Sequence, residues 1–359
     1  MVSIVSGHGT GLFNTSRDLL GAAGELGRAQ YGRNGERVTI NAANGNLVIQ
    51  DGDEHLVGLG QNLDVLRTYN SLAAWDGDNG DGWRIGYYRR VQFDAAANVV
   101  KRIESDGGES TYAAIGNGQY RSTDGAGQFD VVSFDATTRT WTWVDGDTGS
   151  SETYRESAVN DGNFLLREIR DAEGHTTTIG YSGSLISRIA RGDEWIDLTY
   201  EAGSSRIHQL ETHYTDAGQN RTRTLTTYDY QSNRLSKVTT DLTPDRTDDS
   251  STYWTSYGYD SAGRLNSITQ ADGSAQSIRY DDSTGRVSKF IDARGETSLD
   301  YNPATRTTTI TDPLMLRTFL VYDSANRLKQ ISGAATGGTA LVQRFEYDAV
   351  TGGGRRSRW

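Results

Sequence analysis

The sequence predicts an all-β protein, built as a curved, continuous sheet of stacked antiparallel hairpins. Strand-length runs with alternating apolar residues are separated by Asp-Gly, Asn-Gly and Thr-Gly turns along most of the chain. Within the C-terminal third, tyrosine recurs every 21 residues, and a fixed period indicates stacked structural units. Only 35% of the residues are hydrophobic, which suits a broad sheet close to water rather than a thick core.

Composition and charge exclude several classes of function. The net charge of −11 leaves no basic face for nucleic acid or an anionic membrane, apart from a short Arg-rich stretch near the end. The chain has no cysteine, which excludes disulfides and thiolate metal sites. The first residues are too polar for a signal peptide, and no apolar stretch is long enough to span a membrane. We expect no cofactor, no nucleic-acid partner and no membrane insertion.

Residues 1–35 are predicted to form a lead-in segment that is irregular or weakly helical. The stretch TSRDLLGAAGELGR could form one short helix, because Thr15 and Asp18 fit a capping box. The three glycines within that stretch weaken the helix.

Residues 36–95 are predicted to form a small β-meander ahead of the repeats. Two alternating stretches, VTI from Val38 and LVI from Leu47, flank Asn44-Gly45. Asn-Gly is the strongest short hairpin signal, because both central residues of the favoured two-residue turn need positive φ. The stretches LDVLRTYNS and GWRIGYYRRVQFD supply further strands.

The rest of the chain is predicted to be hairpin repeats of increasing regularity. The spacing of turns is irregular over residues 96–250 and becomes regular over residues 251–350. Residues 351–359 form a Gly/Arg-rich tail.

Each regular repeat has a turn with the same residue types at equivalent positions. In YDSAGRL from Tyr259, Asp260 is placed to accept backbone hydrogen bonds and Gly263 to supply a left-handed conformation. In YDSANRL from Tyr322, Asn326 replaces the glycine, because asparagine also tolerates that conformation. The residues that define the motif are Tyr259, Asp260, Gly263, Arg264, Tyr280, Asp281, Gly285, Arg286, Tyr301, Tyr322, Asp323, Asn326 and Arg327.

Contacts between repeats are predicted from the same motif. We expect the tyrosines to pack across strands, and each repeat arginine to pair with the turn aspartate of its own or the next unit. One point stays open, because Leu265 and Ile268 fall on opposite faces of a regular strand. Either a bulge between them brings both to one face, or both faces are half-buried.

The repeat pattern Y-D-x-x-G-R-L-x-x-I-T-x-x-D-G resembles the YD repeat of the Rhs (rearrangement hotspot) proteins. That family also includes the toxin-complex B and C components and the teneurins. VTINAANGNLVIQ, LDVLRTYNS and GWRIG resemble, in order, the β-region that precedes the repeats in many bacterial members. The resemblance covers roughly residues 36–350. The repeat copies lie at 259–273, 280–295 and 322–331, with looser copies at 228–239, 301–313 and 345–348.

The resemblance implies that the repeats form a long β-strip that spirals into a hollow shell. In toxin-bearing members that shell encloses a C-terminal effector, and a core-terminal segment carries a DPxGL-type stretch and an aspartate peptidase. Here TDPLML at 311–316 lacks the glycine and lies between two further repeats. The resemblance therefore implies the front portion of such a shell, without a proteolytic core or a toxin domain.

We therefore expect a non-enzymatic β-scaffold, the N-terminal fragment of an Rhs-type shell that encapsulates or carries a C-terminal effector. The expected partners are that effector or further repeats of a longer protein. The strand edge near residues 345–359 also favours self-association. The resemblance implies an extracellular or cell-surface location.

Two stretches suggest ligands. WDGDNGD offers a weak Ca²⁺ candidate in Asp76, Asp78 and Asp81, although Gly80 stands one position early for the usual loop and a polar turn is favoured. None of the five histidines has a metal-binding or triad spacing. TWTWV places Trp141 and Trp143 on one strand face, where they could stack on a glycan as in an adhesin, or pack against a neighbouring strand, which we favour.

Overall fold

Nearly all the regular structure of this protein is β-strand. The chain is represented by a computed structural model that describes residues 2–7, 9–13, 26, 36–58, 60, 62–73, 81–157, 162–246, 249, 251–333, 342–348 and 354–357. Its elements are strands, apart from one 3-10 turn, η1 (Gly125–Gly127). The all-β prediction is therefore confirmed.

Five strands near the N-terminus form an inner sheet of their own. Their spatial order follows the chain, β1-β2-β3-β4-β5, with β1 parallel to β2 and the other neighbours antiparallel. The β-meander predicted for residues 36–95 contains β2 to β5, but its last predicted stretch, GWRIGYYRRVQFD, forms two strands, of which the second belongs to the other sheet. The bounds are β1 (Ser3–Val5), β2 (Arg37–Asn41), β3 (Leu47–Leu56), β4 (Leu63–Asn70) and β5 (Trp83–Ile85).

The lead-in segment contributes a buried strand that the sequence did not predict. In β1, Ile4 lies opposite Ile40 of β2, and both side chains are buried. Ile4 also exchanges backbone hydrogen bonds with Leu26, at 2.9 and 3.1 Å. Leu26 is the one residue of the predicted helical stretch that the structure describes, and it forms a β-bridge; the rest of that prediction lies outside the described residues.

The Asn-Gly hairpin forms between β2 and β3, but its turn is longer than the predicted two-residue turn. Ile40 pairs with Leu47, and of the Asn-Gly dipeptide only Gly45 has positive φ, at 77°. The side-chain oxygen of Asn41 accepts a hydrogen bond from the Ala43 amide at 2.9 Å, which holds the wider loop. This loop keeps Ile40 and Leu47 together on the buried face, where each is 0% exposed.

The remaining strands form one long strip in which each pairs antiparallel with the next along the chain. The strip begins with β6 (Arg90–Asp94), β7 (Val99–Ile103), β8 (Glu109–Gly116), β9 (Gln119–Ser122), β10 (Val131–Asp135), β11 (Thr140–Val144), β12 (Ser151–Glu156) and β13 (Asn163–Arg170). It continues with β14 (Thr176–Ser182), β15 (Leu185–Arg191), β16 (Glu194–Tyr200), β17 (Ile207–Asp216), β18 (Gln219–Gln231), β19 (Arg234–Asp241), β20 (Thr252–Tyr259), β21 (Leu265–Gln270) and β22 (Ala275–Tyr280). It ends with β23 (Val287–Asp292), β24 (Gly295–Asn302), β25 (Thr307–Thr311), β26 (Arg317–Tyr322), β27 (Leu328–Gly333), β28 (Val342–Tyr347) and β29 (Gly354–Ser357).

The first part of the strip closes into a ring, a feature that the predicted open strip lacked. In β13, residues 163–165 pair with β6 and residues 168–170 pair with β14. One strand therefore closes the ring from β6 to β13 with its first half and continues the strip with its second half. Closure joins Arg90 to Asn163, which lie 73 positions apart and share a hydrogen bond of 3.1 Å.

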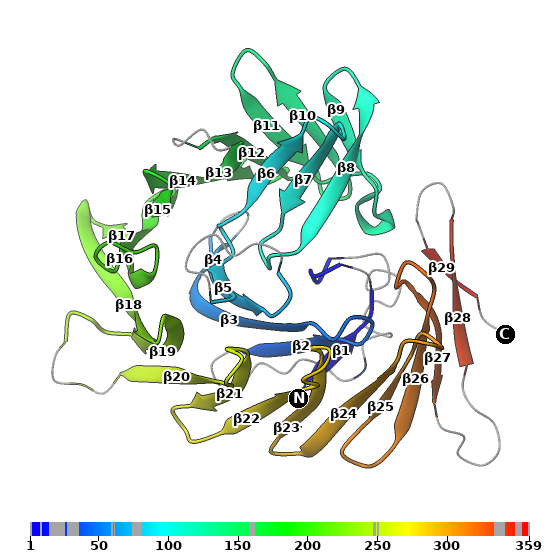
Figure 1. Cartoon of the computed structure of the whole chain (residues 1–359). Helices are drawn as coiled ribbons and strands as arrows, with labels where there is room; N and C mark the ends of the chain where they lie inside the picture. The colour runs from blue at the N-terminus through cyan, green and yellow to red at the C-terminus, as the bar shows by residue number, and fades with distance from the viewer. Residues whose placement is uncertain are drawn as a thin grey trace.

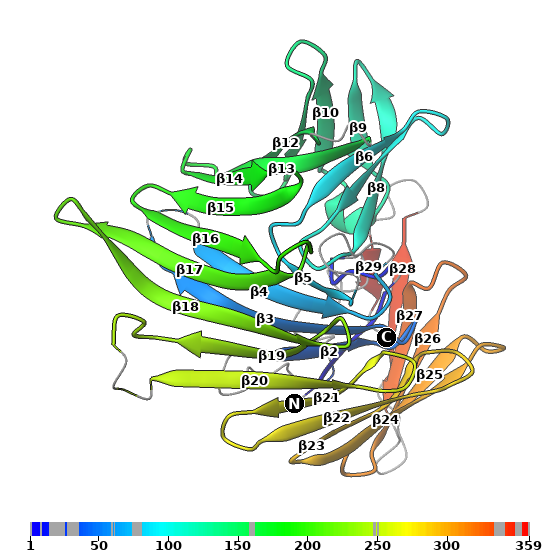
Figure 2. The same ribbon diagram turned by 60° about the vertical axis from the view of Figure 1, so that its left-hand side comes forward.

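From β13 onward the strip curls around the inner sheet. Figure 1 shows β14 to β28 as an arc on the outside of the blue inner strands, and Figure 2 shows β16 to β20 running past β3 and β4. Buried side chains of both sheets form one continuous core, which includes Trp83 of β5 and Phe290 of β23. The inner sheet therefore fills the concave side of the strip.

A bulge recurs at the tyrosine of most repeat hairpins, and it decides the alternative that the sequence left open. Tyr259 pairs with Leu265 while Gly258 pairs with Ser267, so Asn266 is the extra residue. Leu265 and Ile268 both reach the buried face, at 0% and 1% exposure. The same shift occurs beside Tyr181, Tyr200, Tyr230, Tyr280 and Tyr322.

Candidate functional site

The repeat turns are built by their aspartates. Asp260 accepts backbone hydrogen bonds from Ala262 and Arg264 at 3.0 and 2.9 Å, and its second oxygen accepts one from the Arg264 side chain at 2.7 Å. Gly263 closes the turn with φ of 79°. Although burial opposes ionisation, these donors lower the pKa of Asp260 below its usual value.

The Asn326 turn has the same construction. Asp323 accepts from the amides of Ala325 and Arg327, each at 2.9 Å, and from the Arg327 side chain at 2.8 Å. Asn326 takes the place of the turn glycine with φ of 60°. The two seven-residue motifs therefore differ at one position, and their turns follow the same backbone path.

The repeats are joined by a tyrosine hydroxyl. In six units the hydroxyl donates a hydrogen bond to a backbone carbonyl at the start of a strand in the preceding hairpin, whereas the Tyr322 hydroxyl lies 3.3 Å from the Ser6 hydroxyl. Because that strand start is also where the bulge lies, the bond fixes the offset between neighbouring units. The pairs, at 2.6–3.0 Å, are Tyr200 with Ile186, Tyr230 with Ile207, Tyr259 with Leu235, Tyr280 with Leu265, Tyr301 with Val287 and Tyr347 with Leu328.

The turn arginines reinforce the same junctions. Each guanidinium lies over the ring of a tyrosine in the next unit, with 4.5–5.6 Å between the guanidinium carbon and the ring centroid. A cation over a π face adds an attraction of about 0.5–1 kcal/mol at exposed sites. The pairs are Arg206 with Tyr230, Arg234 with Tyr259, Arg264 with Tyr280, Arg286 with Tyr301 and Arg327 with Tyr347.

A buried ionic cluster fixes the inner sheet to the strip. Arg67 of β4 donates to Asp51 at 2.9 Å, to Asp53, and across the interface to the Tyr257 hydroxyl at 2.7 Å. The Tyr228 hydroxyl reaches from the strip to Asp53. Removing one partner from such a buried ion cluster costs about 3–5 kcal/mol, because the other charge is left uncompensated.

The acids of this interface exceed its cations. Burial, together with the nearby charge of Asp51, raises the pKa of Glu36 from 4.5 to about 8. Burial raises the pKa of Asp51 to about 7, against the opposing charge of Arg67. Glu36 accepts a hydrogen bond from the Gln270 side chain of the strip at 3.3 Å. The contact between the two sheets therefore depends on the protonation of buried carboxyl groups.

A second buried ionic cluster lies inside the ring. Arg102 of β7 donates to Glu152 of β12 at 2.7 Å and to the Tyr154 hydroxyl at 2.9 Å. Although burial opposes ionisation, Arg102 and Arg89 hold the pKa of Glu152 at about 2. This carboxylate stays charged and holds three strands of the ring together.

The two candidate glycan-binding tryptophans lie in the interior of the ring. Trp141 is 3% exposed and packs among aromatic rings, including Phe134 at a centroid distance of 4.8 Å. Trp143 is 9% exposed, and the guanidinium of Arg102 lies 3.8 Å from its ring centroid. The cross-strand alternative, which the sequence analysis favoured, describes this packing, and neither tryptophan forms an exposed stacking platform.

Of the three aspartates in the Ca²⁺ candidate, the structure describes only Asp81. Asp81 is buried, and its oxygens accept hydrogen bonds from the amides of Trp83 at 3.0 Å and Leu235 at 2.7 Å. It joins the inner sheet to β19 of the strip, which is a structural role. Asp76 and Asp78 lie outside the described residues.

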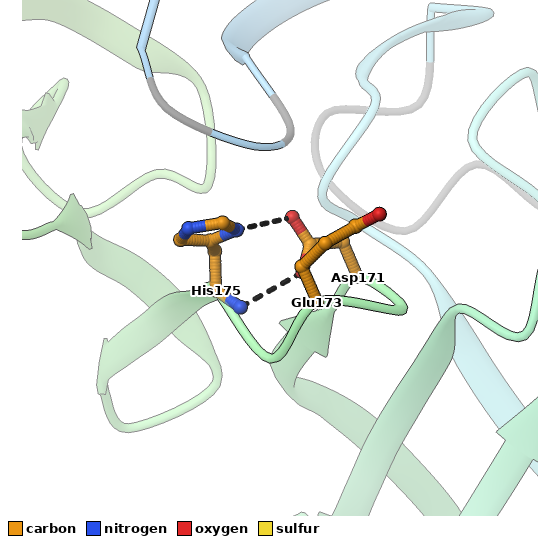
Figure 3. Close-up of side chains that lie close together, drawn as sticks. All are labelled: Asp171, Glu173 and His175. Atoms are coloured by element: carbon orange, nitrogen blue, oxygen red, sulfur yellow. Dashed lines mark hydrogen bonds and ion pairs between the residues drawn. The ribbon is translucent and has the colours of Figure 1, made fainter.

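One group with metal-ligand chemistry was missed by the sequence analysis. Asp171, Glu173 and His175 follow one another in the turn between β13 and β14, and their ligand atoms lie within 4.8 Å of one another (Figure 3). A D-x-E-x-H pattern in a tight turn would have been the signal. Asp171 accepts from both the backbone and the ring of His175, at 2.8 and 2.9 Å. The same atoms that could hold a divalent cation therefore already close the turn.

Comparisons with known proteins add the following findings. A family model described as "Domain of unknown function (DUF6531)" matches residues 38–112, which run from β2 into β8. The search of the curated proteins found no match. Among the described residues, no helix is long and apolar enough to cross a membrane.

Two solved structures align with most of the chain. The crystal structure of TcdB2-TccC3 aligns over 88% of this chain and 24% of its own, with 9% identity and a TM-score of 0.32. The crystal structure of TcdB2-TccC3-Cdc42 aligns over 88% and 23%, with 10% identity and a TM-score of 0.32. This chain spans about a quarter of the length of those chains.

Proposed function

We propose that this chain is a non-enzymatic β-scaffold, part of an Rhs-type shell that houses or carries a polypeptide in a longer protein. The observation that carries the proposal is the repeated junction between hairpins. Six units offer a carbonyl to the tyrosine of the next, as Leu265 does to Tyr280 and Val287 to Tyr301. A junction that recurs along the strip lets it grow by similar steps, which is what a shell wall requires.

The curvature of the strip supports the same proposal. The apolar residues of the repeats face inward, and the polar turns lie at the strip's margins and outer face. Buried acids also join elements of the scaffold, as Glu152 does through its ion pair with Arg102. The partners in this proposal are a C-terminal effector segment or further repeats, and the location is extracellular or at the cell surface.

A protease-protection experiment tests the carrier role. The chain is joined to an Rhs-type core and effector downstream, and the rate of effector cleavage by a broad protease is followed. We expect slower cleavage than for the effector alone or for the effector joined to an unrelated β-protein. Equal cleavage rates in all three would show that the chain does not house a cargo.

A glycan-binding adhesin is the other function that the sequence suggested. Its motivating residues, Trp141 and Trp143, are buried among ring side chains. No observation in the described residues therefore favours it over the scaffold.

A further inference from the structure

Three consecutive repeat turns surround a small polar pocket of about 150 Å³. Its lining includes the side chains of Arg286 and Arg306, the amides Asn302 and Asn326, and the hydroxyl residue Thr307. Among the described lining residues there is no carboxylate. In a chain with a net charge of −11, two arginines facing a pocket without an acid form a local excess of positive charge.

Arg286 does not form the ion pair with its turn aspartate that Arg264 and Arg327 form. Arg264 and Arg327 stand four positions after their turn aspartates and bridge them at 2.7 and 2.8 Å. Arg286 stands five positions after Asp281, because that turn has one extra residue. Asp281 accepts hydrogen bonds from the amides of Ser283 and Thr284, and no ion pair joins it to Arg286 in the described part of the chain.

Arg306 lacks a carboxylate partner for a different reason. Its turn, NPATRT, matches DATTRT at residues 135–140, where Arg139 forms an ion pair with Glu156 across the strands. The register places Tyr322 opposite Arg306, where Glu156 stands opposite Arg139. The turn aspartate of the earlier copy is also replaced, by Asn302. Both carboxylates near the arginine are thus absent from this copy.

The backbone under Arg306 is unusual for an arginine. Its φ is 49°, and it occupies the left-handed turn position that Gly285 fills with φ of 71° in the preceding repeat. An arginine is rare in this left-handed position, and here it lines the pocket.

The floor of the pocket is held between the two sheets. Ala43 of the β2–β3 loop is part of the lining. The Thr308 hydroxyl donates to the Ala42 carbonyl at 2.6 Å, and the Val287 amide donates to the Gly45 carbonyl at 3.1 Å. These bonds fix the backbone on both sides of the pocket, which lowers the entropic cost of ordering it around a ligand.

We propose that this pocket binds a tetrahedral oxyanion of the phosphate or sulfate type. Two guanidiniums supply charge-assisted hydrogen bonds, which are the strongest that a protein offers to such an anion. The asparagine side-chain amides supply further donors, whereas the Thr307 hydroxyl already donates to the Thr305 carbonyl at 3.3 Å. The volume suits a small group. The anion can be free, or can be a monoester at the end of a sugar or lipid headgroup.

Calorimetric titration of the whole chain at low ionic strength tests the proposal, with inorganic phosphate and sulfate as the probes. We expect saturable binding to one site, and a loss of about tenfold in affinity for Arg306→Gln and for Arg286→Gln. The matched controls are Arg139→Gln and Arg264→Gln. These arginines stand at the equivalent turn positions of other hairpins and already form ion pairs. These two variants should bind as the unchanged chain does.

Asn302→Asp is the most direct variant, since it restores the carboxylate of the earlier copy and keeps the acceptor that holds the turn. We expect an unchanged melting temperature and a loss of binding. Full affinity in this variant, or in both arginine variants, would overturn the proposal, as would the lack of any saturable binding in the unchanged chain. Glucose 6-phosphate and vesicles containing phosphatidic acid, titrated in the same way, distinguish a sugar source from a lipid source.

Discussion

The hydroxyl of a repeat tyrosine determines how one hairpin is set against the next. In Tyr280 it donates to the Leu265 carbonyl at 2.7 Å, at the point where the bulge shifts the strand register. The ring also lies beneath the guanidinium of Arg264. One side chain therefore combines packing, a hydrogen bond and a cation–π contact at each junction.

Tyr280→Phe tests the hydroxyl, which also interacts with the Tyr69 hydroxyl of the inner sheet. The ring and its contact with Arg264 remain, but the Leu265 carbonyl loses its donor, so we expect the free energy of unfolding to fall by about 1–2 kcal/mol. Denaturant unfolding measures the change. Tyr214→Phe is the control, because Tyr214 is 37% exposed, and it should change stability by less than about 0.5 kcal/mol. An equal effect of both substitutions would contradict the role of the junction.

Asn326 tests the turn. With φ of 60° it stands where Gly263 stands in the sister repeat. We expect Asn326→Ala to lower the free energy of unfolding by about 1 kcal/mol, because alanine tolerates the left-handed region poorly. Asn326→Gly should remain within about 0.5 kcal/mol of the unchanged chain. The midpoint of denaturant unfolding distinguishes these outcomes, and a tolerated alanine would show that the turn does not need the left-handed residue.

At the scale of elements, the contact of the inner sheet with the strip holds a buried ionic cluster. Arg67 meets Asp51 and Asp53 there, and Glu36 adds a third acid close to the Gln270 side chain. A single arginine cannot neutralise three buried carboxylates. The interface therefore keeps protons that the unfolded chain would release.

The free energy of unfolding should consequently depend on pH through Glu36. The folded chain holds this proton up to about pH 8, whereas the unfolded chain releases it near 4.5. Because the folded state binds more protons between those values, stability falls as the pH rises from about 5 to about 8. Below that window the contribution is unaffected, and above it the loss is complete.

Glu36→Gln isolates this effect. The amide keeps the shape of the side chain and is neutral at every pH, so we expect the variant to equal the unchanged chain near pH 5. Near pH 8.5 the variant should be more stable by about 4–5 kcal/mol, because each unit of the pKa shift of Glu36 corresponds to about 1.4 kcal/mol. Denaturant unfolding over a pH series provides the measurement, with the exposed Glu296→Gln as the control. A constant difference between the chains at all pH values would refute the coupling.

The sequence predicted the elements well where the signal was local. The Asp260 turn, the left-handed Asn326 and the alternation of Ile40 follow from residues within one hairpin. Contacts between distant segments could not be predicted in this way. The bond between Arg67 and Tyr257 joins residues 190 positions apart, and no period relates them.

The candidate pocket illustrates the same limit. Arg306 reads in the sequence as one more arginine of a polar turn. Only the register, which sets Tyr322 rather than an acid opposite it, shows that its charge is uncompensated. The buried strand β1 was also missed, because a strand of three residues within a polar segment is too short to show a periodic pattern.

At the scale of the whole molecule, the strip is a ribbon with one closed and one open part. In the described residues, β29 pairs with β28 and with no other strand. An unpaired strand edge is a template for another chain. We expect the average mass from light scattering to rise with protein concentration and to fall again on dilution. A constant monomer mass across the range would contradict association through this edge.

Ring closure can be tested because the chain has no cysteine of its own. Asn163 of β13 lies directly opposite Gln92 of β6, and the Gln92 side chain donates to Asn163 at 2.6 Å. In the double variant Gln92→Cys with Asn163→Cys, mild oxidation should therefore form an intramolecular disulfide. Mass spectrometry of the digested protein identifies the cross-link.

The cross-link also predicts a change in stability. It closes a loop that contains the whole ring, and such a constraint on the unfolded chain stabilises a protein by about 2–4 kcal/mol when the native geometry accepts it. The control joins Gln92→Cys with Thr178→Cys, which lies on β14 beyond the bend of β13 and should stay reduced. If oxidation yielded only cross-links between molecules, β6 and β13 would not be neighbours, and the strip would be open from its first strand.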